Sequence, residues 1–171
     1  MTDWDEIEIL PRTLGLRDHA QDTRERRELI IMRAGERLFG LYADEADSVT
    51  EQARPTPLPH APAAVLGVVS VRGRMRTVLS PSALLGDADE LSATKAARYV
   101  VSLRGDEQLA LAVERVERVV EILTEDVRTH AYTDAPVRGV LTQEDASTIV
   151  LLDPARLFEA ATRDVERRRA R

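Results

Sequence analysis

Two stretches of the chain repeat the same order of hydrophobic and polar positions. Residues 29–51 (LIIMRAGERLFGLYADEADSVTE) align without a gap with residues 99–121 (YVVSLRGDEQLALAVERVERVVE), at an offset of 70. Each stretch has two apolar runs separated by a polar turn with glycine, followed by a charged segment. This pattern predicts a β-hairpin and then a short helical or irregular segment. The aligned pairs are Ile30 with Val100, Ile31 with Val101, Gly35 with Gly105, Leu41 with Leu111, Asp44 with Glu114 and Val49 with Val119.

The correspondence resumes after the charged segments. Residues 66–68 (LGV) match residues 138–140 (RGV), and residues 77–85 (TVLSPSALL) match residues 150–158 (VLLDPARLF). In both of the longer segments a Ser or Asp precedes a proline, which is typical of a helix N-cap and first helical position. Each half is therefore predicted to end as strand, cap and helix. Short apolar strands resemble one another by chance, but four matches in one order favour a duplicated unit.

The duplication predicts two small β-barrels that are fused face to face. A unit of about 65 residues buries only about 60% of its surface, whereas two packed units share a larger core. The composition between the repeats supports a division into two units, because the polar segment GDADELSATKAA separates the two copies. The predicted boundaries are an N-terminal extension over 1–26, a body over 27–162, and a basic C-terminal tail over 163–171 that follows a packed helix. Within the body, the barrel halves are expected at about 27–90 and 98–160, with a connector at 86–97.

Composition narrows the class of protein. The chain has 171 residues, of which 30 are acidic and 24 basic, so its formal charge is −6 and its pI is about 5.2. That balance argues against a general coat for nucleic acid or anionic membrane. The absence of cysteine excludes disulfides and thiolate sites. The start of the sequence does not resemble a secretory signal and no stretch has the length of a membrane span, so a cytoplasmic protein without direct membrane insertion is expected.

The sequence carries no pattern typical of an enzyme. Its three histidines are isolated, its carboxylates are dispersed, and Ser70 lacks the glycine placement of a nucleophile elbow. We therefore expect no catalytic residue, metal site or cofactor. A barrel that binds single-stranded nucleic acid is a remote alternative, because only 4% of residues are aromatic. Four of these aromatic residues are expected in the core: Phe39, Tyr42, Tyr99 and Phe158.

Three arginines alternate with apolar residues in the segment GVVSVRGRMRTV. Strand geometry turns alternate side chains to opposite faces. We therefore expect one set to point inward, namely Val69, Val71 and Met75, and the other set to point outward, namely Arg72, Arg74 and Arg76. In the same reading Gly67 and Gly73 are strand positions at which the backbone bends or approaches a neighbour closely.

The segment VLGVVSVRGRMRTVLSPSALLG, at residues 65–86, resembles the central signature of CheW-like domains, the adaptor modules of bacterial chemosensory arrays. With the opening hairpin and the segments VRGV and TIVLLDPARLF, the resemblance covers about four fifths of the chain. It implies a mainly β fold of two SH3-like barrels packed around a shared core. The matching positions are Gly67, Val68, Arg72, Gly73, Val78 and the ALLG ending; the departures from the family pattern are Ser48, Ser70, Val71, Thr77 and Ser80.

The resemblance implies a non-enzymatic adaptor that couples the cytoplasmic tip of a chemoreceptor to the regulatory domain of a CheA-type histidine kinase, with no cofactor. It places Arg72 at the receptor-binding surface, together with its neighbours Val71 and Gly73. It places further partner contacts near Ser48, Val49, Gly67 and Ser70. Because Ser48 and Ser70 depart from the family pattern on these surfaces, an accessory protein that binds only receptor or only kinase is the alternative.

Overall fold

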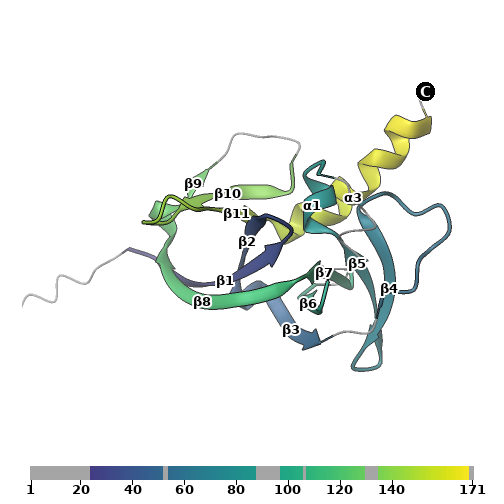
Figure 1. Cartoon of the computed structure of the whole chain (residues 1–171), viewed down its shortest axis with the longest axis horizontal. Helices are drawn as coiled ribbons and strands as arrows, with labels where there is room; N and C mark the ends of the chain where they lie inside the picture. Colours follow the sequence, from purple (N-terminus) through teal and green to yellow (C-terminus); the bar gives the residue numbers. More distant parts are fainter. Residues whose placement is uncertain (1–23, 52–53, 88–96, 106, 130–134, 170–171) are drawn as a thin grey trace, which may run out of the picture.

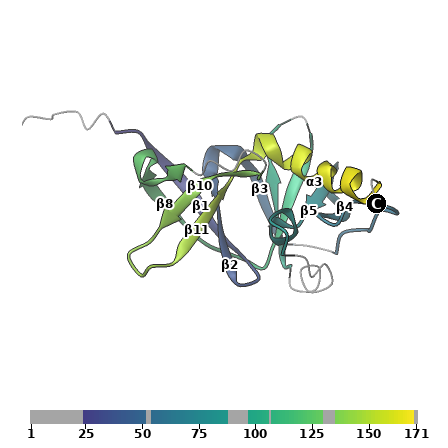
Figure 2. The ribbon, with the colours of Figure 1, turned by 90° about the horizontal axis from the view of Figure 1, so that it is seen from above.

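The computed structural model describes residues 24–51, 54–87, 97–105, 107–129 and 135–169. The fold is mainly β and has two curved sheets, which lie side by side in Figure 2. The first sheet has the strand order β8 (Arg115–Leu123), β1 (Arg26–Ala34), β2 (Arg37–Tyr42), β11 (Thr148–Leu152), β10 (Val137–Thr142) and β9 (Arg128–Thr129). The second sheet has the order β3 (Ala46–Glu51), β6 (Tyr99–Leu103), β7 (Leu109–Val113), β5 (Arg74–Leu79) and β4 (Val65–Val71).

The two sheets repeat one arrangement of strands. Strands β8, β1, β2, β11 and β10 of the first sheet correspond in order to β3, β6, β7, β5 and β4 of the second. In each sheet one pair is parallel, β2 with β11 and β5 with β7, while the neighbouring pairs are antiparallel. Both β4 and β10 also contain a register shift just before a glycine. The strands follow the duplication that the sequence predicts. The expectation of a helical or irregular segment after each hairpin is wrong, however, because these charged segments form the strands β3 and β8.

The two sheets do not coincide with the two halves of the chain, however. Each half contributes its opening hairpin to one sheet and its last strands to the other, and the crossing follows the short 3₁₀ turn η1 (Ala43–Glu45) in the first half. The assignment of one barrel to residues 27–90 and the other to residues 98–160 is therefore wrong. The physical reason is that a hairpin alone leaves a sheet edge open, and strands of the other half pair with it.

Three apolar clusters explain how the sheets hold together. The central cluster takes residues from both sheets, including Met32 and Phe39 of the first sheet and Val101 and Leu111 of the second. A second cluster lies within the second sheet and includes Val71, Val78 and Val100, and a third lies within the first sheet. Each sheet, curved as Figure 1 shows, thus has a small core of its own, and the largest core takes residues from both sheets.

Two helices begin as the Ser-Pro and Asp-Pro motifs predict. In α1 (Pro81–Leu84) the Ser80 hydroxyl accepts a hydrogen bond from the Ala83 amide at 3.3 Å, which is an N-cap contact. The second helix, α3 (Pro154–Arg169), buries Leu157 and Ala161 in the central cluster. It continues to Arg169, so most of the segment predicted as a basic tail is helical. No helix in the described ranges is long and apolar enough to cross a membrane.

One prediction about the core is wrong. Phe39 and Tyr42 are buried and Tyr99 is partly buried, as expected, but 52% of Phe158 is exposed. Phe158 lies next to the fully buried Leu157 in α3, and successive residues of a helix point about 100° apart. Only one of the two can therefore face the central cluster.

Gly67 lies where the backbone of β4 meets the segment that precedes it. Thr56 exchanges two backbone hydrogen bonds with Val68, both of 2.9 Å. A Cβ atom built on Gly67 would lie 2.1 Å from the Thr56 carbonyl oxygen, and its φ of +143° is one that side chains rarely adopt. Only glycine fits this contact without displacing the backbone.

Substituting Gly67 with alanine should lower the free energy of unfolding by about 3 kcal/mol, because backbone strain and a backbone clash act together. The matched control is Gly73→Ala, since Gly73 also has a positive φ but a Cβ atom added there would meet no other atom within 4 Å. This control should cost about 1 kcal/mol. Urea unfolding of both variants measures the difference, and equal losses would contradict the close contact between Gly67 and Thr56.

Candidate partner-binding surface

The hairpin of β4 and β5 turns at the two residues Arg72 and Gly73. Their φ values are +50° and +77°, and the flanking residues Val71 and Arg74 are paired. Two positive φ values in a two-residue loop are the signature of a type I′ turn, which asparagine and glycine adopt most easily. An arginine in the left-handed region is uncommon. Its presence at this turn therefore calls for a reason other than the geometry of the turn.

The turn also changes which side chains face inward. The expectation that Met75 points inward and Arg76 outward is wrong, since 55% of Met75 is exposed and only 5% of Arg76 is. Residues paired across two strands share a face, and Val69 pairs with Arg76 while Ser70 pairs with Met75. The two-residue turn therefore moves the inward positions from odd numbers in β4 to even numbers in β5.

Arg76 is the buried cation of the second sheet. Its guanidinium donates a hydrogen bond of 2.9 Å to the Leu103 carbonyl at the end of β6 and one of 3.0 Å to the carboxylate of Asp47 in β3. Its Nε atom is buried and has no hydrogen-bond partner among the described residues. Arg76 thus connects β5 to the edge strand β3 across the interior of the second sheet, beside the cluster that contains Val78.

Strands β3 and β4 lie at opposite edges of the second sheet in hydrogen-bonding order, and the segment between them brings these edges together. Strand β3 ends at Glu51, and Thr56 pairs with Val68 of β4 only five residues later. Five residues span at most about 17 Å. The sheet therefore curls toward a barrel, and β3 and the hairpin of β4 and β5 belong to one surface region.

The structure divides the expected site residues into exposed and covered ones. Ser70, Arg72 and Gly73 are exposed at the hairpin, and 45% of Val49 is exposed on β3. The other three are covered by the chain itself. Val71 packs into the core of the second sheet and Gly67 lies against Thr56. The Ser48 hydroxyl is buried and has no hydrogen-bond partner among the described residues. Of the expected site residues, the ones accessible to a partner are thus Ser70, Arg72, Gly73 and Val49.

Sequence reasoning missed two features of this region, the ion pair that the buried Arg76 forms with Asp47 and the exposed side chain of Met75. Both features follow from the two-residue turn. The alternating pattern did not indicate this turn, because Arg74 and Arg76 continue the two-residue spacing that begins at Arg72. The dipeptide Arg-Gly is not a common type I′ sequence. The signal that was present is Gly73 between two polar residues, which is also the composition of a turn.

The first sheet has a polar cluster of its own, and its charges are paired within the chain. Arg138 lies 2.6 Å from the Glu45 carboxylate and 3.5 Å from that of Asp153, and its guanidinium lies 4.8 Å from the centre of the Tyr42 ring. Burial lowers the pKa of Arg138, but the hydrogen bond and charge of Glu45 raise it, and the pKa ends above its ordinary value. Arg27 covers the Tyr42 ring at 3.5 Å and pairs with Asp44.

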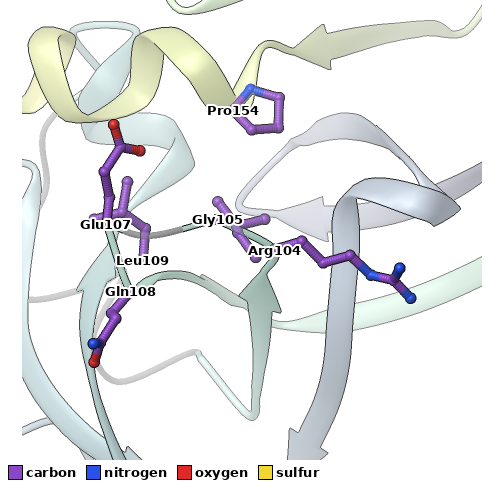
Figure 3. A pocket seen from close by; sticks show the side chains of 7 residues that line it. Arg104, Gly105, Glu107, Gln108, Leu109 and Pro154 are labelled. Carbon is purple, nitrogen blue, oxygen red and sulfur yellow. The ribbon is translucent and has the colours of Figure 1, made fainter.

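A shallow depression, open to solvent, lies between the turn before β7 and the start of α3. In Figure 3 the Glu107 side chain points toward the helix, while the Arg104 side chain points away from Pro154. Arg104 also donates a hydrogen bond of 2.9 Å to the Ala46 carbonyl, so it holds the start of β3. The depression contains none of the site residues expected from the sequence.

The pair of Arg76 and Asp47 predicts unequal effects of removing either partner. Asp47→Ala would leave a buried guanidinium without its counter-charge and should cost about 3 kcal/mol of unfolding free energy. Arg76→Met would leave a carboxylate that is 43% exposed and should cost about 1 kcal/mol, mainly through the lost bond to the Leu103 carbonyl. Chemical denaturation measures both values, and a larger loss for Arg76→Met would show that the pair is not effectively buried.

Comparison with known proteins agrees with this geometry. The family model CheW, described as the CheW-like domain, matches residues 28–162. "Chemotaxis protein CheW" of Rhizobium meliloti (strain 1021) is 40% identical over 60 residues, which make up 35% of this chain and 39% of that relative. The alignment therefore spans less than half of the relative.

A solved structure, the scaffolding protein TtCheW from Thermoanaerobacter tengcongensis, shares the fold. It superposes with a TM-score of 0.63 and 18% sequence identity, covering 78% of this chain and 88% of that one. At this identity the likeness concerns the fold alone. Because the family model spans most of the sequence, from residue 28 to residue 162, the chain belongs to the CheW-like domain family.

Proposed function

We propose that the protein is a non-enzymatic chemosensory adaptor in the cytoplasm, which couples the signalling tip of a chemoreceptor to the regulatory domain of a CheA-type histidine kinase. Membership in the CheW-like family supports this role, and the relatives it matches are named as a chemotaxis protein and a scaffolding protein. The observation that carries the proposal is the exposed Arg72, which the fold holds in a tight turn at a positive φ.

The receptor contact centres on Arg72. A side chain in the left-handed region costs about 1 to 3 kcal/mol, and such strain is found where function requires it. The turn projects Arg72 away from the sheet, and its side chain forms no ion pair or hydrogen bond within the described residues. The guanidinium is therefore available for polar or acidic groups of a receptor helix.

The kinase contact uses the other exposed part of the same region. Val49 on β3 is an exposed apolar side chain, and such residues serve as contacts when a partner covers them. Because Arg76 links β5 to β3 through Asp47, the two contact regions belong to one rigid unit. An adaptor of this kind works by holding two partners at a fixed separation, and no chemical step is required.

A second candidate role is an accessory protein that binds only one of these partners. The observation that favours it is Ser48, which stands where the family commonly has a glutamate and whose hydroxyl is buried without a hydrogen-bond partner among the described residues. This residue offers no carboxylate to a partner. If that carboxylate is essential for one contact, the protein keeps the other contact only.

Separate titrations distinguish the two roles. The full chain is titrated by calorimetry with the signalling fragment of a chemoreceptor and, independently, with the regulatory domain of a CheA-type kinase, both taken from the organism that supplies this chain. Binding of each supports the coupling role, and binding of one supports the accessory role. Binding of neither would overturn the proposal that this chain is a chemosensory adaptor.

Replacing Arg72 with aspartate should weaken receptor binding by about 2 to 5 kcal/mol, the usual cost of disrupting a desolvated interfacial charge pair. Aspartate tolerates the left-handed region, so the turn itself should persist. The matched control is Arg128→Asp on β9, an exposed arginine of the first sheet. Calorimetric titration measures the affinity and circular dichroism checks the fold. An unchanged affinity with an intact spectrum would rule out Arg72 as a receptor contact.

A further inference from the structure

Two neighbouring arginines at the hairpin have no partner within the described part of the chain. Arg72 and Arg74 are exposed on either side of Gly73, and neither side chain forms an ion pair or hydrogen bond there. Elsewhere the protein commonly pairs its arginines, as with Arg33 and Glu117 at 2.7 Å and Arg37 and Asp87 at 2.8 Å. A protein with a formal charge of −6 thus leaves unpaired positive charge at the hairpin.

A third exposed arginine lies near the same hairpin. The bridge between Thr56 and Val68 is antiparallel, so the chain before Thr56 runs toward the later residues of β4. Arg54, two residues before the bridge, is therefore directed toward Ser70 and the turn. It is exposed and forms no ion pair or hydrogen bond with the described residues.

An apolar side chain accompanies these charges. Met75 is 55% exposed and shares the outward face of the hairpin with its cross-strand partner Ser70, whereas Arg74 pairs with Val71 and is exposed at the end of the other face. Methionine adapts its shape to a partner surface and is common at binding surfaces. We call this set of five residues the arginine tip: Arg54, Ser70, Arg72, Arg74 and Met75.

The chemistry of the arginine tip points to an acidic protein surface as its partner. Guanidinium groups match carboxylates in geometry and charge. A single-stranded nucleic acid fits less well, because it needs aromatic stacking residues. No aromatic side chain is present in the hairpin of β4 and β5, where the exposed apolar residue is Met75.

We propose that the arginine tip selects a partner segment rich in carboxylates, with Arg74 and Arg54 adding charge contacts beside Arg72. This inference rests on the proposed function and specifies the receptor surface that meets the hairpin as acidic. Arg74 and Arg54 increase the rate of encounter with that surface, since exposed charges at the edge of an interface act mainly through steering.

The test uses the full chain and the receptor signalling fragment, with association rates measured by surface plasmon resonance at about 0.05 and 0.5 M salt. Arg74→Glu and Arg54→Glu should each reduce the association rate at low salt, by about tenfold together. The reduction should nearly vanish at high salt. Arg128→Glu on β9 makes the same charge change away from the tip, and its rate should stay near that of the unmodified chain.

Other outcomes separate this inference from the proposed function. If the unmodified chain does not bind the fragment, the proposed function fails. If it binds and the two tip variants behave like Arg128→Glu, the adaptor role stands and the arginine tip is overturned as a selector. A fluorescently labelled oligonucleotide is the second probe. Salt-dependent binding of the oligonucleotide that Arg74→Glu abolishes, without an effect on the receptor fragment, would assign the tip to nucleic acid and overturn the inference.

Discussion

The apolar contact between the two sheets is the interaction on which the rest of the structure depends. Met32 and Phe39 of the first sheet and Val101 and Leu111 of the second are almost fully buried in one cluster. Because each half of the chain gives its opening hairpin to one sheet and its later strands to the other, neither half completes a sheet by itself. Burial of the central cluster and completion of both sheets therefore accompany each other, which favours cooperative folding of the whole unit.

This rigid arrangement supports the proposed role of the hairpin of β4 and β5 as a binding element. The turn at Arg72 and Gly73 lies at the end of β4 and β5, and β5 is paired with the buried strand β7. Arg76 extends the support by binding Asp47 and the Leu103 carbonyl. The hairpin that carries Arg72 is thus fixed on its inner side. Little conformational entropy of the hairpin is therefore lost when a partner binds.

Much of the fold was predictable because it depends on patterns within single strands. The repeat at an offset of 70, the Ser-Pro and Asp-Pro caps and the inward valines of β4 all follow from local spacing. The exchange of hairpins between the sheets was not predictable. Pairing of strands within one half of the chain and pairing between the two halves satisfy the same alternation of apolar residues. The family resemblance supplied Arg72, but no alternation identifies a type I′ turn at Arg-Gly, so Met75 and Arg76 were assigned to the wrong faces.

The proposed function requires one rigid unit to hold two partners at once. The most direct measurement is light scattering after size-exclusion chromatography of the full chain with the receptor fragment and the kinase regulatory domain in excess. The account predicts a ternary complex whose mass equals the sum of the three components. This complex should persist when the concentration of either partner is raised further. A mixture of two binary complexes, in which each partner displaces the other from the chain, would contradict it.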